Sequence, residues 1–353
     1  MRSALILSAL AVIAAAIPSP QELPIDAIDT VPDPDVQGPD PTIQTDPVDY
    51  DSSAAIKAAI ADVEQDPPSI RKKRDGGCEP QPAGSGPVPY PDSPEAFLAS
   101  SDIASTAGSA ATPASYSQSF SNLNGSISSL GYMGLYTLTS YDVALCASKC
   151  NNAYPCQAFN IYFERDPTVN PSYGSACPNP PSLTNIKCTL WGYPVYAETA
   201  KNTGQWRSQF QVVIAGSNGY NRVLPYKTPS GWTGPTVLPG AINAPLLNGA
   251  NTYMGYKFFK DIYDPSVCTA ACDATTAYNR RHPSNCKYNV CRYVNAYILT
   301  ENNVPQGFYC SMYSANWDPS YAANTGQTRG SDVYRVVDSV SFFNATADSG
   351  MTC

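Results

Sequence analysis

Residues able to perform acid–base or nucleophilic chemistry are few and scattered in this 353-residue chain. His282 is the single histidine, and it lies in the polar stretch Arg280-Arg281-His282-Pro283, which matches no catalytic motif. No G-x-S-x-G sequence is present to place a serine nucleophile on a strand-to-helix turn. We therefore predict that the protein is not an enzyme and that His282 is an exposed loop residue.

Glu164 and Asp166 are the carboxylates best placed for glycoside hydrolysis, which needs only two such groups. They flank Arg165 directly after a strand-like segment, so the alternative is a solvated turn with a local ion pair. We favour the turn. No glycine-rich phosphate loop follows a strand-like segment, and no Asp-rich calcium loop occurs after residue 74. We accordingly predict no catalytic, cofactor-binding or metal-binding residue.

Twelve cysteines carry the remaining reactive chemistry, and all of them lie after residue 74. An even number of cysteines in a chain that opens with a secretory signal predicts a disulfide framework formed in an oxidising compartment. Zinc binding is the alternative, but the C-x3-C pairs have no neighbouring histidine ligands. We therefore expect disulfide-bonded cysteines rather than metal ligands.

The cysteines belong to an internal repeat. The first copy contains Tyr132-Met133-Gly134, Tyr141-Asp142, Cys146, Cys150, Cys156-Gln157-Ala158-Phe159-Asn160-Ile161-Tyr162, Cys188-Thr189-Leu190-Trp191 and Asn202-Thr203-Gly204-Gln205-Trp206-Arg207. The second copy contains Tyr253-Met254-Gly255, Tyr263-Asp264, Cys268, Cys272, Cys291-Arg292-Tyr293-Val294-Asn295-Ala296-Tyr297, Cys310-Ser311-Met312-Tyr313 and Asn324-Thr325-Gly326-Gln327-Thr328-Arg329. The same landmarks in the same order predict two related modules of ordinary domain size.

The same landmarks predict the elements that position the cysteines. In the Y-D-x3-C-x3-C stretch the two cysteines are one helical turn apart, Asp142 and Asp264 are expected N-caps, and Pro265 suits the first helical position. The segments 156–162, 188–191 and 211–214 are rich in aromatic and β-branched residues, which is typical of strands. The predicted fold class is α+β, with a short helix cross-linked to a small antiparallel sheet in each module.

This pattern resembles the PAN/apple domain, and the chain after residue 74 is most similar to secreted, mostly uncharacterised tandem proteins of filamentous fungi. The resemblance covers residues 130–215 and 250–340. It implies disulfides that join Cys146 to Cys188, Cys150 to Cys156, Cys268 to Cys310 and Cys272 to Cys291.

Four cysteines are left without an implied partner, and they allow three connectivities. They are Cys78, Cys177, Cys286 and Cys353. Pairing within each module, Cys78 with Cys177 and Cys286 with Cys353, is slightly favoured. A bridge from Cys78 to Cys353 would instead tie the two ends together.

The first 74 residues differ from the rest in composition. A charged start and an apolar run that ends in Ala14-Ala15-Ala16 predict a signal peptide over residues 1–16. Residues 17–74 have neither Cys nor Trp and carry 12 acidic and 5 basic side chains, so we expect a disordered propeptide. It ends in Arg71-Lys72-Lys73-Arg74, where Lys73 and Arg74 are the expected kexin-type processing site. A solvated charge run is the alternative.

The remaining segments complete the expected organisation: a Ser/Ala/Pro-rich arm over 75–125, modules over 126–218 and 241–353, and a proline-stiffened linker over 219–240. Asn124 and Asn344 begin N-glycosylation sequons. No apolar stretch is long enough to span a membrane, which argues against membrane insertion. The part after residue 74 is close to neutral, which argues against nucleic acid as a partner.

Aromatic side chains are the main candidates for ligand binding. Trp232 and Trp317 have Gly/Pro-rich or Asn/Asp-rich neighbours, so we expect them to be exposed and to contact a ligand. The repeated Asn-Thr-Gly-Gln at 202 and 324 is expected to form a turn, with ligand contact as a second role.

The expected function is that of a secreted, non-enzymatic recognition protein, which binds carbohydrate or protein at the cell wall or cell surface. The expected partners are a polysaccharide or an extracellular protein, together with the processing protease, and no cofactor is expected. One alternative is a structural component of the wall or matrix without a defined soluble ligand. Another is a glycoside hydrolase that uses Glu164.

Overall fold

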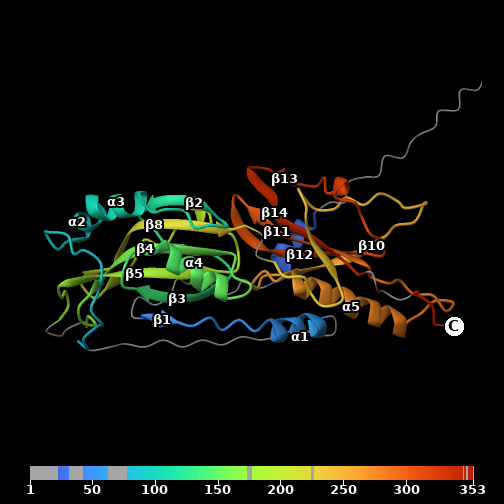
Figure 1. The fold of residues 1–353 in the computed structure, drawn as a ribbon, viewed down its shortest axis with the longest axis horizontal. Helices are drawn as coiled ribbons and strands as arrows, with labels where there is room; N and C mark the ends of the chain where they lie inside the picture. Colours follow the sequence, from blue (N-terminus) through green and yellow to red (C-terminus); the bar gives the residue numbers. More distant parts are fainter. Residues whose placement is uncertain are drawn as a thin grey trace, which may run out of the picture.

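A computed structural model describes residues 23–31, 43–62, 78–172, 177–223, 226–344, 346 and 349–352. Two antiparallel sheets lie next to each other along the long axis of the molecule, and helices pack on a face of each (Figure 1). None of the described helices is long and apolar enough to cross a membrane. The architecture is therefore a mixture of antiparallel sheets and few helices.

The first sheet has six strands in the order β1-β3-β5-β4-β8-β2. Their bounds are β1 (Thr45–Asp46), β2 (Tyr116–Leu123), β3 (Tyr132–Leu138), β4 (Ala158–Pro167), β5 (Ser182–Trp191) and β8 (Val213–Arg222). Every residue of β4 is buried, because β5 and β8 flank it and both faces of the sheet are covered. The three strands predicted in the first repeat are present as β4, β5 and the start of β8.

The second sheet repeats this plan in the order β10-β12-β11-β14-β13. Its strands are β10 (Tyr253–Phe259), β11 (Tyr293–Glu301), β12 (Val304–Tyr313), β13 (Gly326–Arg329) and β14 (Asp332–Phe343), and β9 (Thr233–Val237) also pairs with β14. Smaller elements are the ribbon of β6 (Trp206–Arg207) and β7 (Phe210–Gln211) and the 3-10 turns η2 (Ala197–Thr199) and η3 (Pro319–Tyr321).

The two predicted helices are α4 (Val143–Asn152) and α5 (Pro265–Arg281). Both expected N-caps are confirmed: the side chain of Asp142 accepts a hydrogen bond from the amide of Leu145, and that of Asp264 accepts one from the amide of Ser266. The polar stretch around His282 differs from the expected loop, because α5 continues through Arg281 and His282 is its exposed C-cap.

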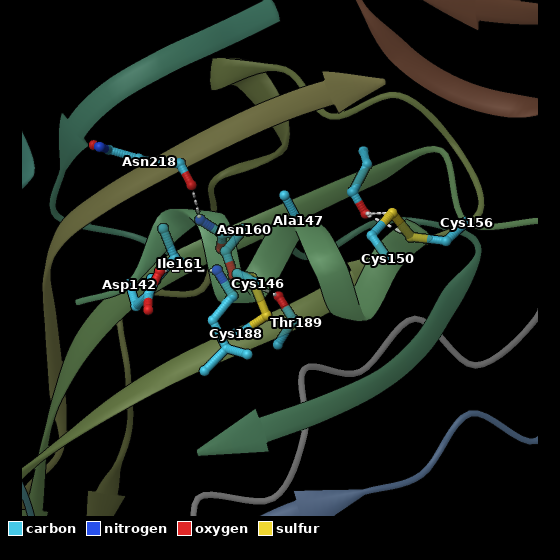
Figure 2. The surroundings of a disulfide bond; sticks show 12 residues. Asp142, Cys146, Ala147, Cys150, Cys156, Asn160, Ile161, Cys188, Thr189 and Asn218 are labelled. Carbon is cyan, nitrogen blue, oxygen red and sulfur yellow. Dashed lines mark hydrogen bonds between the residues drawn. A yellow bond between two sulfur atoms is a disulfide. The ribbon is translucent and has the colours of Figure 1, made fainter. Parts of the chain in front are cut away.

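Disulfides join α4 and α5 to their sheets, and Figure 2 shows the bridges of α4. The structure contains Cys146–Cys188 and Cys150–Cys156 in the first half, and Cys268–Cys310 and Cys272–Cys291 in the second. These are the pairs that the PAN/apple resemblance implied. Cys78 pairs with Cys177, which is the favoured local pairing. Cys286 is disulfide-bonded too, and Cys353 lies outside the described residues.

The predicted extended arm instead folds onto the first sheet. It forms α2 (Pro94–Leu98), α3 (Ser101–Gly108) and then β2, which pairs with β8. Phe97 and Ile103 are buried in the first core, and this burial stabilises helices too short to be stable alone.

The predicted linker, residues 219–240, also contributes to the sheets rather than only connecting them. It begins within β8, and β9 adds a strand to the second sheet. Trp232 is buried directly before β9.

The expectation of a disordered propeptide is wrong for residues 23–31 and 43–62. These residues contain the 3-10 turn η1 (Ile25–Thr30), strand β1 and helix α1 (Ser52–Asp62). In Figure 1, β1 and α1, in blue, run along one side of the molecule from the first sheet to α5. Leu23, Ile25 and Ile28 are buried against the second sheet, which supplies the apolar surface that the segment lacks by itself.

Candidate functional site

The two tryptophans predicted to contact a ligand are buried. Trp232 is 7% exposed and its indole nitrogen donates to Asp273 Oδ2 over 3.2 Å. Trp317 is 6% exposed and donates to Thr252 Oγ1 over 3.1 Å. Both rings fill cores beside the second sheet, because the Gly/Pro-rich and Asn/Asp-rich segments around them fold back onto it. Exposure was the wrong inference from these neighbours.

The repeated Asn-Thr-Gly-Gln segments form turns, as predicted. The amide oxygen of Asn202 accepts a hydrogen bond from the Gly204 amide over 3.2 Å, and that of Asn324 accepts one from Gly326 over 3.4 Å. The sequence reasoning missed Trp206, which directly follows the first turn and is 65% exposed. The available signal was the comparison of the two copies: Thr328 stands where the first copy has Trp206. A polar residue at the equivalent position indicates that this position is not part of a core.

An equivalent buried asparagine organises each sheet. Asn160 of β4 accepts from the Ile127 amide and donates to Ser217 and to the Asn218 carbonyl, at 3.0, 2.8 and 2.9 Å. Asn295 of β11 makes the same set of bonds: it accepts from the Ile242 amide and donates to Ser339 and the Val340 carbonyl. The two sheets therefore share side-chain hydrogen bonding as well as strand order.

Beyond Asn160, charged side chains lie on the face of the first sheet away from α4. Tyr162 is paired with Lys187, and Glu164 with Asn185, across β4 and β5. Lys187 Nζ is 3.8 Å from Glu164 Oε1, and Asn185 Nδ2 donates to Asp166 Oδ2 over 2.8 Å.

The predicted solvated turn at Glu164 and Asp166 is wrong, because β4 continues through Pro167 and leaves these side chains 5% and 2% exposed. The carboxyl groups are thus too deeply buried in this structure to reach a polysaccharide chain. Oxygen atoms Glu164 Oε1 and Asp166 Oδ1 have no hydrogen-bond partner among the described residues.

The electrostatics of this cluster favour a neutral Glu164. Burial raises the pKa of Glu164 well above its usual range, and the negative charge of Asp166 raises it further, while Lys187 opposes the shift. Burial also raises the pKa of Asp166, against the opposing effects of Lys187 and the hydrogen bond from Asn185. At a pH at which two exposed carboxyl groups would both be ionised, Glu164 and Asp166 therefore retain one proton between them.

The folded protein consequently binds the Glu164 proton more tightly than the unfolded chain does. This contribution to stability is fully present below the usual Glu pKa of about 4.5 and is lost as the pH rises through the folded-state value. The Glu164→Gln variant should lose this dependence, so its free energy of unfolding relative to wild type should rise with pH by up to about 1.4 kcal/mol per unit. Urea unfolding at pH 4, 6 and 8 measures it. Parallel pH profiles for the two proteins would contradict the prediction.

In the second sheet, aromatic side chains take the equivalent positions. Tyr297 of β11 pairs with Tyr309 of β12, as Tyr162 pairs with Lys187, and the two tyrosine rings stack with centroids 5.4 Å apart. Leu299 stands two residues after Tyr297, where Glu164 follows Tyr162 in the first sheet. The same face is thus charged in one sheet and aromatic in the other.

The N-terminal segment, residues 23–31 and 43–62, contacts this face at Ile43 in the first sheet and through residues 23–28 in the second. Its other parts lie elsewhere: β1 pairs with the edge strand β3, and α1 packs against α5. Lys187 Nζ donates to the carbonyl of Ile43 over 2.6 Å, and the Tyr309 hydroxyl donates to the carbonyl of Pro24 over 2.8 Å. The segment is also anchored between the sheets, where Tyr50 and Ser52 donate to Asp264 Oδ2 over 3.2 and 2.6 Å. Equivalent strand positions therefore donate to backbone carbonyls of the same N-terminal segment.

No known family model, curated protein or solved structure matches this chain. The function must therefore be inferred from the geometry of the chain itself.

The other predicted sites are the two glycosylation sequons and the processing site. Asn124 is exposed, whereas Asn344 is half-buried and its amide donates to Asp273 Oδ1 over 3.4 Å. Lys73 and Arg74 lie outside the described residues. Within the described ranges, no group of three or more His, Cys, Asp or Glu residues is arranged to hold a metal ion.

Proposed function

We propose that this chain is a secreted, non-enzymatic recognition protein with two PAN/apple-like modules, which binds polysaccharide or an extracellular protein at the cell wall or surface. The main support is the equivalent position of Lys187 and Tyr309, each bound to a backbone carbonyl of the N-terminal segment. Because that segment precedes the expected cleavage site, its removal would uncover the face of the second sheet around Tyr309 and free Lys187 of its contact with Ile43.

The disulfide framework supports secretion, because such bridges persist in oxidising compartments. Two related modules on one chain would raise the apparent affinity for a repetitive ligand such as a wall polymer. Trp206 offers an exposed aromatic ring next to the first repeated turn, and such rings are common in sugar and protein recognition.

The purified chain, cleaved after Arg74, should be retained by insoluble chitin, by β-glucan or by whole fungal walls. Reduction of the disulfides should abolish retention, because the helices would no longer be tied to the sheets. The Trp206→Ala variant should be retained less well than wild type. Tyr90→Ala is the matched control, since Tyr90 is 97% exposed and lies far from the repeated turn in sequence.

Retention that survives reduction would indicate non-specific adsorption and count against the proposal. No retention on any matrix, together with no protein captured from intact wall surfaces, would favour the alternative of a structural wall or matrix component.

A further inference from the structure

The face of the second sheet opposite α5 carries an aromatic platform. It consists of Phe258, Tyr297, Leu299, Tyr309, Tyr334 and Val336. The rings of Phe258 and Tyr309 are 4.6 Å apart between centroids, and Tyr309 also stacks on Tyr297. Aromatic surface of this extent is usually buried in a core or against a partner.

Residues 23–30 cover the aromatic platform. Leu23, Ile25 and Ile28 are 4, 5 and 9% exposed, although Ile25 and Ile28 belong to the turn η1, Leu23 precedes it, and none of the three is in the sheet. Spaced apolar residues in a single 3-10 turn thus give the acidic segment one apolar side. This apolar side packs on the platform through side chains, and η1 does not pair with any strand of the sheet.

Two polar contacts orient the turn on the platform. Tyr309 donates to the Pro24 carbonyl over 2.8 Å, and Arg329 of β13 is 2.7 Å from Asp26 Oδ1. The ion pair is exposed, with 42% of the Arg329 side chain and 90% of the Asp26 side chain accessible. It therefore orients the turn on the platform more than it strengthens binding. The platform therefore recognises three features: an aliphatic pair, a backbone carbonyl and an acidic side chain.

The contacts taken together favour a peptide, because they combine aliphatic side chains and an acidic side chain with a main-chain carbonyl. Both sheets use the same strand position, Tyr309 or Lys187, to donate to a main-chain carbonyl, and carbonyls recur along any peptide. We infer that the aromatic platform is a binding site for an aliphatic, acidic peptide segment of another protein, which residues 23–30 occupy in the uncleaved chain. This inference rests on the proposed recognition function and commits it to a protein partner at this face.

The uncleaved chain itself provides the test. In the Ile25→Asp/Ile28→Asp variant the turn loses its apolar side, so the platform should be open to a peptide added in trans. A fluorescein-labelled peptide with the wild-type residues 22–31 should then bind saturably in fluorescence anisotropy, at least about tenfold more tightly than it binds the wild-type chain, whose platform is occupied. Unchanged circular dichroism would show that the variant is folded.

Variants of the platform test the contacts. In the opened chain, Tyr309→Phe should weaken peptide binding by about 2- to 10-fold through loss of one hydrogen bond. The matched control Tyr278→Phe alters an exposed tyrosine of α5 and should leave the affinity unchanged. A peptide with lysine in place of Asp26 should bind up to about 5-fold more weakly, and Arg329→Glu in the chain should reverse that preference.

A folded Ile25→Asp/Ile28→Asp chain that does not bind the peptide would overturn the inference. If that variant fails to fold, wild-type chain cleaved after Arg74 and freed of its N-terminal fragment is titrated instead, and absence of binding there overturns it equally. Displacement of the bound peptide by a soluble oligosaccharide would assign the platform to carbohydrate. Retention on a polysaccharide without peptide binding would sink this inference and leave the proposed function standing.

Discussion

Replacing Cys146 and Cys188 together with alanine is expected to lower the free energy of unfolding by about 4 kcal/mol. The bridge ties α4 to β5 across a sequence separation of 42 residues, and both cysteines are fully buried. Its loss restores the conformational freedom of that loop in the unfolded chain. Urea unfolding followed by circular dichroism measures the change, with Cys268→Ala/Cys310→Ala as a matched pair because its separation is also 42 residues.

A comparison within α4 tests the reason for this effect. Cys150 and Cys156 are only six residues apart, so the loss of their bridge should cost roughly 2.2 kcal/mol under the same loop-closure argument. Equal losses for the two bridges would show that loop length is not what determines the stabilisation.

The Asn160→Ala variant is expected to lose about 2 to 4 kcal/mol of stability. It leaves the amide of Ile127 and the carbonyl of Asn218 without the side chain that now pairs with them, inside a strand where every residue is buried. Asn295→Ala removes the equivalent bonds in the second sheet and should cost a similar amount.

Asn152→Ala serves as the control for both asparagine variants, because Asn152 is exposed at the end of α4. It should change stability by less than about 0.5 kcal/mol. A loss for Asn160→Ala no larger than that of the control would remove the basis for treating the two asparagines as organising residues.

The cysteine framework and the central strands could be predicted because their signals are local. Cysteines one helical turn apart, an aspartate before each helix and aromatic strand segments are all visible within a few residues of each other. These landmarks located α4, α5, β4 and β5, although β4 and β5 extend beyond the predicted segments. Their recurrence in the second half also indicated equivalent elements there.

The covering face could not be predicted because its signals lie in other parts of the chain. Leu23, Ile25 and Ile28 stand among prolines and aspartates, and only the surface of the second sheet makes them a buried side. Glu164 was assigned to solvent because charge usually indicates exposure, yet cover on both faces of β4 encloses it. Trp232 and Trp317 were predicted to be exposed because their neighbours are Gly/Pro-rich or Asn/Asp-rich. Such neighbours indicate a loop, but they do not show whether the loop folds back and buries the ring.

The N-terminal segment contains no cysteine, so only the backbone and non-covalent contacts hold it to the rest of the protein. While the chain is intact, the tether keeps the segment at a local concentration on the order of millimolar, whatever the amount of protein present. After a cut near Arg74, that concentration falls to the bulk value in the surrounding fluid. Simple dilution would then make the uncovering of the aromatic platform a one-way step.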